Sequence, residues 1–199
     1  MAKPFLVGLT GSIGMGKSET LKIFASHGIP VHDSDAAVHA LYDVGGAAVT
    51  PVEGEFPGTV KDGKVDRAAL SRHVLNDAGA TARLQALVHP LLAAERAKFI
   101  AGLDGGIAVL DIPLLFEIGA EREMDVVIVA SAPPDVQRAR VVARPGMTAE
   151  KFAWLSARQL PDAQKRAKAD FVVETGNGLA QTRAEVENIL AEIRRRARD

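Results

Sequence analysis

Cysteine is absent from this chain of 199 residues, which excludes disulfide scaffolds, thiolate metal sites and cysteine nucleophiles. Long apolar runs are also absent, and no stretch approaches the roughly 20 residues that a membrane-spanning helix requires. Neither sign of charge dominates, since 24 Lys and Arg stand against 25 Asp and Glu. No global field therefore favours nucleic acid or an anionic membrane. We expect a cytoplasmic protein with no nucleic-acid or membrane partner.

Short apolar segments rich in β-branched residues alternate with helical patterns along much of the chain. The clearest predicted strands cover residues 5–9, 107–110 and 126–130, and weaker ones cover 29–31 and 171–173. Helical stripes are carried by Leu84, Leu87, Val88, Leu91 and Leu92, and by Val186, Ile189, Leu190 and Ile193. This alternation predicts an α/β fold with a parallel sheet flanked by helices.

Residues 34–103 interrupt the alternation. We predict no strand there, but one helix, a Gly- and Pro-bearing loop over 43–65 and two further helices, with Pro90 kinking one of them after His89. Such a block is typical of a helical subdomain inserted into an α/β core. We place the subdomain at residues 41–103, and the core at residues 1–40, 104–144 and 159–199.

The segment "GSIGMGKS" matches G-x-x-x-x-G-K-[S/T], and it lies between a predicted strand and a helical pattern. Glycines let successive backbone N–H groups point at phosphate oxygens, and the helix N-terminus adds partial positive charge. Lys17 would reach the β- and γ-phosphates, and the Ser18 hydroxyl would bind Mg²⁺. The sequence predicts a site for a nucleoside triphosphate and Mg²⁺, built from Gly11, Ser12, Ile13, Gly14, Met15, Gly16, Lys17 and Ser18.

A phosphate loop by itself fits a switch, a motor or a phosphotransferase. A GTPase should carry N-K-x-D for guanine, and no such tetrapeptide occurs in the chain. A motor ATPase is usually longer. A helical insertion and an arginine-rich segment suit a kinase, because transfer to a small acceptor needs an acceptor pocket and a closing lid.

Two carboxylates follow the predicted strand at 29–31. Asp33 and Asp35 should lie at the carboxyl edge of the sheet, where open α/β sheets bind ligands. We favour Asp33 as the catalytic carboxylate because it is the first residue past this strand, although Asp33 or Ser34 could instead cap the next helix. Asp111 ends another predicted strand, where it could support Mg²⁺, directly or through water, or cap the strand end.

The segment after residue 130 carries spaced arginines. Arg140 and Arg144 are four residues apart, hence on one face of a predicted helix. "RPGMT" should break that helix, and Thr148 should start another that carries Arg158. This pattern indicates a lid over residues 145–158, although a solvated basic face is the alternative. Trp154 would then pack within the lid, in preference to stacking on a base.

Several motifs occur together: "LTGSIGMGKS", "VHDSDAAVHAL", "GKVDRAAL", "LVHPLL", "VLDIPLLFE", "DVQRARVVAR" and "ADFVVETG". In this order they resemble the dephospho-CoA kinase family, over residues 5–193. The resemblance implies a P-loop core, a helical acceptor-binding domain and a lid. It also implies the last step of coenzyme A synthesis, in which ATP phosphorylates the ribose 3′-hydroxyl of dephospho-CoA to give coenzyme A and ADP.

The resemblance also implies roles for single residues. Asp33 would orient or deprotonate the acceptor hydroxyl, Arg140 would stabilise the transferring phosphoryl group, and Thr10 would contact the reacting phosphate. Further residues expected at the site are Asp35 and His89 for the acceptor and Arg144, in the lid, for ATP.

The chain departs from the family pattern at two positions. Thr175 stands where many members have Asn, so an adenine contact by that asparagine does not transfer. Leu155 stands where relatives often have Arg, which leaves Arg158 as a substitute.

The rival functions are a P-loop kinase for another small alcohol or nucleotide and a nucleotide-binding regulatory module without catalysis. We expect a monomer or small homo-oligomer.

Overall fold

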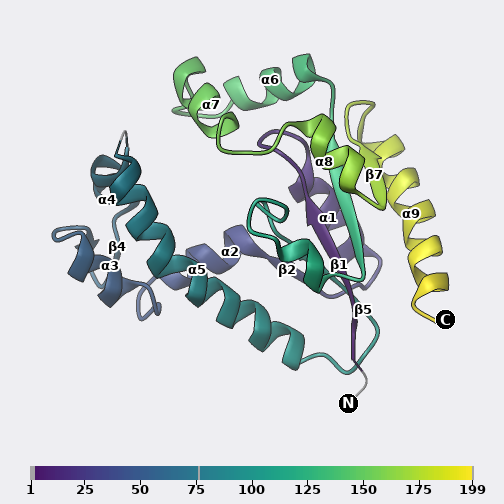
Figure 1. The fold of residues 1–199 in the computed structure, drawn as a ribbon, viewed down its shortest axis with the longest axis horizontal. Coiled ribbons are helices and arrows are strands. Elements are labelled where there is room, and N and C mark those ends of the chain that lie inside the picture. The colour runs from purple at the N-terminus through teal and green to yellow at the C-terminus, as the bar shows by residue number, and fades with distance from the viewer. Residues whose placement is uncertain (1–2, 76, 199) are drawn as a thin grey trace. The chain divides into compact units, whose positions relative to one another are not determined.

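The computed structural model describes residues 3–75 and 77–198 and divides the chain into two compact units (Figure 1). The core unit holds the residues up to Asp33 and those from Asp104 onward, and the helical unit holds Ser34–Leu103. We had expected the first boundary at residue 40. It lies earlier because helix α2 (Ser34–Tyr42) packs against helix α5 (Ala78–Ala101) of the helical unit.

The core unit is built on one parallel sheet with strand order β2-β5-β1-β6-β7. Both faces of such a sheet are covered, so its strands are near-continuous apolar runs and do not alternate. All six residues of β6 are buried, for example. The strands are β1 (Phe5–Thr10), β2 (Val31–Asp33), β5 (Ile107–Asp111), β6 (Val126–Ser131) and β7 (Phe171–Glu174).

Two helices, α1 (Lys17–Ser26) and α9 (Leu179–Arg196), contribute side chains to one hydrophobic cluster with the sheet residues Val7 and Leu9. Gly8 alternates with these residues and faces the other side. A β-carbon on Gly8 would collide with Leu115 and Met124 of the segment after β5, so glycine permits this close layer.

Carboxylates fix the amino-terminal ends of two central strands. Asp125 Oδ2 accepts from the Leu6 N–H at 2.7 Å, and Asp170 Oδ2 accepts from the Val127 N–H at 2.8 Å. These bonds satisfy backbone donors that would otherwise be buried at the sheet edge. At the opposite edge β5 lies between β1 and β2, and Asp33 is the register partner of Asp111. Asp33 is thus the last residue of β2, not the first residue beyond the strand as predicted.

The arginine-rich part of the core unit forms α6 (Pro134–Val142), α7 (Ala149–Ser156) and α8 (Asp162–Lys168). Thr148 caps α7 as predicted, accepting from the Lys151 N–H at 3.2 Å. The prediction that Arg140 and Arg144 share a helix is wrong, because α6 ends before Arg144. A residue that precedes proline disfavours helical backbone, and Pro145 follows Arg144. Arg158 likewise lies beyond the end of α7, not on it.

The helical unit has its own apolar cluster, which includes Leu41, Val52, Phe56 and Leu70. Its remaining elements are α3 (Val49–Glu55), β3 (Val60–Lys61), β4 (Lys64–Val65) and α4 (Arg67–Val74). Pro90 lies inside α5, which continues through it to Ala101.

The prediction of no strand between 34 and 103 is wrong, since β3 and β4 form an antiparallel hairpin. Its two-residue turn is Asp62–Gly63, both with positive φ (51° and 76°), as the tight hairpin turn requires. Part of the segment expected as loop is ordered by Glu53, which accepts from the N–H groups of Gly58, Thr59 and Val60. These hydrogen bonds hold the pKa of Glu53 below its ordinary value, and the bond from Gly58 has the largest effect.

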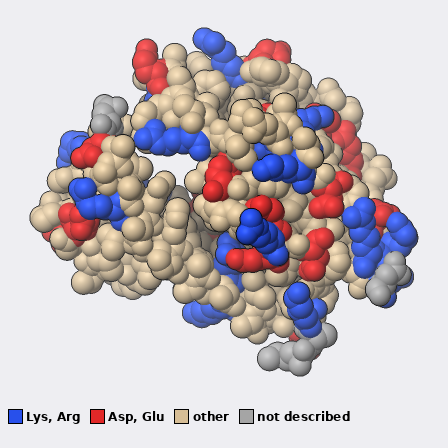
Figure 2. All heavy atoms as spheres, viewed as in Figure 1, with Lys and Arg blue, Asp and Glu red and all other residues tan. Residues whose placement is uncertain are grey.

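Acidic and basic side chains are interspersed on the visible face of the core unit in Figure 2, in keeping with a formal net charge of −1. Among the helices of the described residues, none combines the length and apolarity that a membrane crossing needs.

Candidate active site

The phosphate loop joins β1 to α1, and its glycines are required by its backbone and its neighbours. Gly11 (φ 154°) lies so close to the Ala130 carbonyl that a β-carbon would collide with it. Gly16 (φ 88°) precedes the first residue of α1, and a β-carbon there would collide with the Thr175 side chain. The loop therefore enters α1 in a conformation that L side chains rarely adopt, with the N–H groups of the first helical turn free of helical partners.

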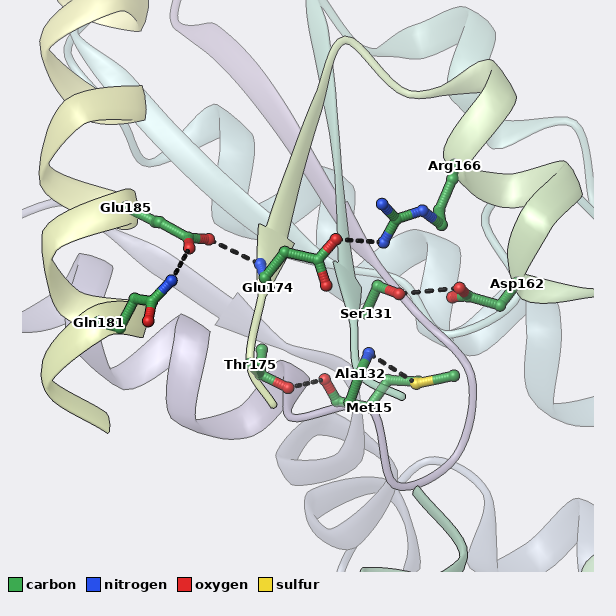
Figure 3. A network of polar contacts seen from close by, with 9 residues as sticks. All are labelled: Met15, Ser131, Ala132, Asp162, Arg166, Glu174, Thr175, Gln181 and Glu185. Atoms are coloured by element: carbon green, nitrogen blue, oxygen red, sulfur yellow. Dashed lines mark hydrogen bonds and ion pairs between the residues drawn. The ribbon is translucent and has the colours of Figure 1, made fainter. Parts of the chain in front are cut away.

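Buried polar contacts attach the loop to the ends of β6 and β7. The Thr175 hydroxyl donates to the Met15 carbonyl at 2.8 Å, and the Ala132 N–H donates to Met15 Sδ at 3.1 Å (Figure 3). The same sheet edge carries bonds from Ser131 to Asp162 and from Arg166 to Glu174, also drawn in Figure 3. Met15 is therefore a structural anchor within the predicted nucleotide-binding segment.

Arg140 of α6 lies beside the phosphate loop. Its guanidinium donates to the Thr175 hydroxyl at 2.9 Å, to the Thr175 carbonyl at 2.6 Å and to the Gly14 carbonyl at 3.4 Å. Sequence reasoning noted only that Thr175 departs from the family pattern, and it missed that Thr175 links β7, the loop and Arg140. The structure thus brings Arg140 to the loop, directly at Gly14 and through Thr175, and its predicted role toward the phosphoryl group stays a prediction.

Lys17 and Asp111 form an ion pair at the carboxyl edge of the sheet. Lys17 Nζ lies 3.6 Å from Asp111 Oδ1, and the Asp111 side chain is only 3 % exposed. A buried carboxylate needs such a cation, because desolvation otherwise disfavours its charged form. Asp111 was expected to support Mg²⁺ or to cap the strand, and in this structure it pairs with the lysine of the phosphate loop.

Thr10 and Asp33 complete the residues that the core unit brings to this edge. Thr10 is fully buried, and its hydroxyl donates to the Pro113 carbonyl at 3.2 Å. Asp33 ends β2 beside Asp111 in the sheet register. An edge with a phosphate loop, a lysine, an arginine and a carboxylate offers what phosphoryl transfer requires: phosphate ligands, cations and a group to accept a proton.

The oxygen donors near the loop fit Mg²⁺. Ser18 lies exposed in the first turn of α1. Asp111 forms an ion pair with Lys17, the residue before Ser18. Mg²⁺ is usually bound by one or two protein oxygens together with substrate phosphates and waters. The residues that the structure describes contain no group of three or more His, Cys, Asp or Glu that could hold a metal ion.

Three further predicted residues are described each within its own unit. Asp35, on α2, and His89, on α5, belong to the helical unit, and both are exposed there. Arg144 is exposed in the turn between α6 and α7. Their functional roles stay predictions.

Sequence reasoning missed a buried ion pair behind the loop. The Lys165 side chain is fully buried, and its Nζ lies 2.9 Å from Glu117 Oε1 and 3.4 Å from the Pro113 carbonyl. The same Glu117 oxygen accepts from the Leu160 N–H at 2.8 Å. No local signal distinguishes Lys165 from a surface lysine, because its burial depends on a partner 48 positions earlier in the sequence.

Sequence reasoning also missed two glutamines that bind the backbone of the phosphate loop from other segments. The Ile13 N–H donates to Gln159 Oε1 at 3.0 Å, and Gln137 Nε2 donates to the Ile13 carbonyl at 2.8 Å. Gln137 belongs to the segment "DVQRARVVAR", one of those that carry the family resemblance, but the sequence around it does not predict its contact with Ile13.

Comparison with known proteins finds relatives that match nearly the whole chain. The family model for dephospho-CoA kinase matches residues 5–181. The dephospho-CoA kinase of Mesorhizobium japonicum is 56 % identical over 192 residues, with 95 % of this chain and 96 % of the relative covered.

Solved structures agree with the sequence comparison. A protein from Thermus thermophilus, TT1252, superposes with a TM-score of 0.82 at 33 % identity, covering 96 % of this chain and 98 % of that one. The dephospho-CoA kinase of Campylobacter jejuni superposes with a TM-score of 0.66 at 25 % identity, with the same coverage. Together with the phosphate loop and the carboxylate edge described above, these matches show that the chain belongs to the dephospho-CoA kinase family.

Proposed function

We propose that this protein transfers the γ-phosphoryl group of ATP to the ribose 3′-hydroxyl of dephospho-CoA, giving coenzyme A and ADP. The observation that carries the proposal is the carboxyl edge of the core sheet. There Asp33 is the register neighbour of Asp111, which pairs with Lys17 of the phosphate loop. Family membership over nearly the whole chain supports the choice of acceptor.

The phosphate loop and its neighbours form the ATP side. Loop N–H groups and Lys17 bind the phosphates, and Thr10 lies at the start of the loop for contact with the reacting phosphate. Arg140 and Arg144 stabilise the negative charge that spreads over the transferring group. Mg²⁺, held by Ser18 with Asp111 in support, would neutralise charge on the β- and γ-phosphates when bound.

Asp33 belongs to the acceptor side. The acceptor oxygen forms a bond to the γ-phosphorus while the bond from phosphorus to the ADP oxygen breaks, and the hydroxyl proton passes to the Asp33 carboxylate. The expected acceptor domain, residues 41–103, supplies His89, and Asp35 lies just before it. The expected lid, residues 145–158, covers the phosphates and excludes water.

Asp33→Ala tests the proposal. We expect turnover with dephospho-CoA to fall by about two orders of magnitude or more, because positioning and proton transfer are both lost. ATP affinity should change little, since Asp33 does not belong to the phosphate loop. Asp33→Asn is the matched variant, because it keeps the size and removes the base.

The assay is ADP release with and without dephospho-CoA, beside a panel of other alcohol acceptors. Near-normal turnover of Asp33→Ala would remove Asp33 from the mechanism. A wild-type enzyme that phosphorylates another alcohol and ignores dephospho-CoA would overturn the proposed acceptor.

We further propose that the protein works in the cytoplasm, as a monomer or small homo-oligomer, without nucleic acid or membrane. The lack of cysteine and the even mixture of charges support this setting.

A further inference from the structure

Helix α7 is held in an unusual way for a helix of the core unit. The structure describes all eight of its residues, and none of them is buried. Its helix contact is with α6, the element that precedes it. Phe152, Trp154, Leu155 and Ser156 are half-buried, but no residue of α7 is fully buried, so the segments at its two ends contribute to its position.

Both of those segments contact the same residue of the phosphate loop. Gln137, on α6 before α7, donates to the Ile13 carbonyl at 2.8 Å. Gln159, just after α7, accepts from the Ile13 N–H at 3.0 Å. The two backbone polar groups of one loop residue are thus bound by one residue before and one residue after the α7 segment, which we define as residues 143–158.

The backbone next to Gln159 is anchored to the core unit. The next N–H, of Leu160, donates to Glu117 Oε1 at 2.8 Å. Glu117 is held by Lys165, whose side chain is fully buried. Since the backbone beside Gln159 is anchored to the core in this way, the Gln159 side chain is presented to Ile13 by a built arrangement.

We propose that Gln137 and Gln159 are positioning residues that couple the α7 segment to the phosphate loop, so that nucleotide binding at the loop changes the state of α7. The proposal rests on the proposed function in one respect, namely that the loop binds a triphosphate. Phosphate oxygens compete for loop N–H groups, and any rotation of the Ile13 peptide alters both glutamine bonds at once. The same bonds, when made, hold the loop in the geometry that transfer requires.

The chain carries its own reporter of this coupling. Trp154, the single tryptophan of the sequence, lies on α7, and the Arg158 guanidinium lies 3.4 Å from the centre of its ring. The one indole of the sequence therefore lies within the segment that the proposal concerns, and its fluorescence can be read without a label.

The experiment titrates a non-hydrolysable ATP analogue into the full chain and follows Trp154 emission. We expect a saturable change in the wild type, and loss of most of that change in Gln159→Ala and Gln137→Ala. Gln164→Ala, at an exposed glutamine on α8, is the control and should respond like the wild type. With dephospho-CoA and ATP, each of the two variants should lose about tenfold in kcat, while KM for ATP stays within about threefold.

Glutamate variants separate positioning from mere structural support. Gln159→Glu keeps an oxygen that accepts from the Ile13 N–H, so it should restore part of the response that Gln159→Ala loses. Gln137→Glu removes the donor and sets a carboxylate against the Ile13 carbonyl, so it should be at least as defective as Gln137→Ala.

Three results would overturn the coupling: a wild type whose emission ignores the bound analogue, a full response in both alanine variants, or an equal loss in Gln164→Ala. Failure of the proposed function is a separate observation. It would show as absent transfer to dephospho-CoA by the wild type, whereas the emission change needs the nucleotide alone.

Discussion

The phosphate loop and the α7 segment belong to the same unit and are held by opposite means. The loop has buried residues, among them Ser12 and Met15, and polar contacts to the ends of two strands. The α7 helix has no buried residue and is held at its ends. The difference teaches that the fold fixes the loop through buried contacts, whereas α7, the proposed lid helix, is held without a fully buried residue.

Lys165→Met should have the largest effect, because it breaks the buried ion pair with Glu117 in the core unit. Removing one partner of a buried ion pair leaves Glu117 charged and buried, so we expect a loss of about 3–5 kcal/mol in the free energy of unfolding. Denaturant titration measures the loss. Lys168→Met, at an exposed lysine on the same helix, should stay near the wild-type value. Adding Glu117→Leu to Lys165→Met should recover part of the loss, since no unpaired charge then remains.

A stability of Lys165→Met equal to that of Lys168→Met would show that the ion pair does not stabilise the core unit. The Gln159 contact with Ile13 would then lack the anchored backbone described for it.

Thr175→Val should have an intermediate effect. The change keeps the shape of the side chain but removes the donor to the Met15 carbonyl and the acceptor for Arg140. We expect a loss of about 1–3 kcal/mol in the free energy of unfolding, with weaker ATP binding, because a buried carbonyl loses its partner. Thr175→Ser retains the hydroxyl and should bind ATP more tightly than Thr175→Val in a calorimetric titration. Equal affinities in the two variants would contradict the role of this hydroxyl in shaping the loop.

Thr148→Ala should have the smallest effect, and a local one. The change removes the N-cap bond to the Lys151 N–H, which is worth about 1 kcal/mol to the helix. Because no residue of α7 is fully buried, the melting temperature of the whole protein should change little. Amide hydrogen exchange should accelerate within residues 149–156 while the strands keep their protection. A drop in global stability comparable to that of Thr175→Val would mean that α7 is part of the cooperative core.

The sequence predicted the central strands and the phosphate loop better than the α7 segment. The central strands and the phosphate loop are specified locally, by apolar runs and by a glycine pattern whose spacing the chemistry requires. The carboxylates Asp33 and Asp111 near the strand ends followed from the same local signals, whereas the family was predicted from the resemblance of several motifs together.

The missed features depend on contacts between distant positions or on single-residue boundaries. The pair Lys165–Glu117 and the glutamines on Ile13 join segments that only folding brings together. Arg144 fell outside α6 because Pro145 ends the helix. The β3–β4 hairpin is different, because Asp62–Gly63 is itself a local signal for a two-residue hairpin turn.

The helical unit also has a consequence for how such proteins can diverge. The chain leaves the sheet after Asp33 and rejoins it at Ile107 in the adjacent parallel strand, so the unit is one uninterrupted stretch of sequence between two neighbouring strands. A single genetic exchange spanning that stretch replaces every residue of the helical unit and none of the phosphate loop. If the acceptor is recognised there, an ancestral kinase can acquire a new substrate by recombination while its ATP chemistry is inherited intact.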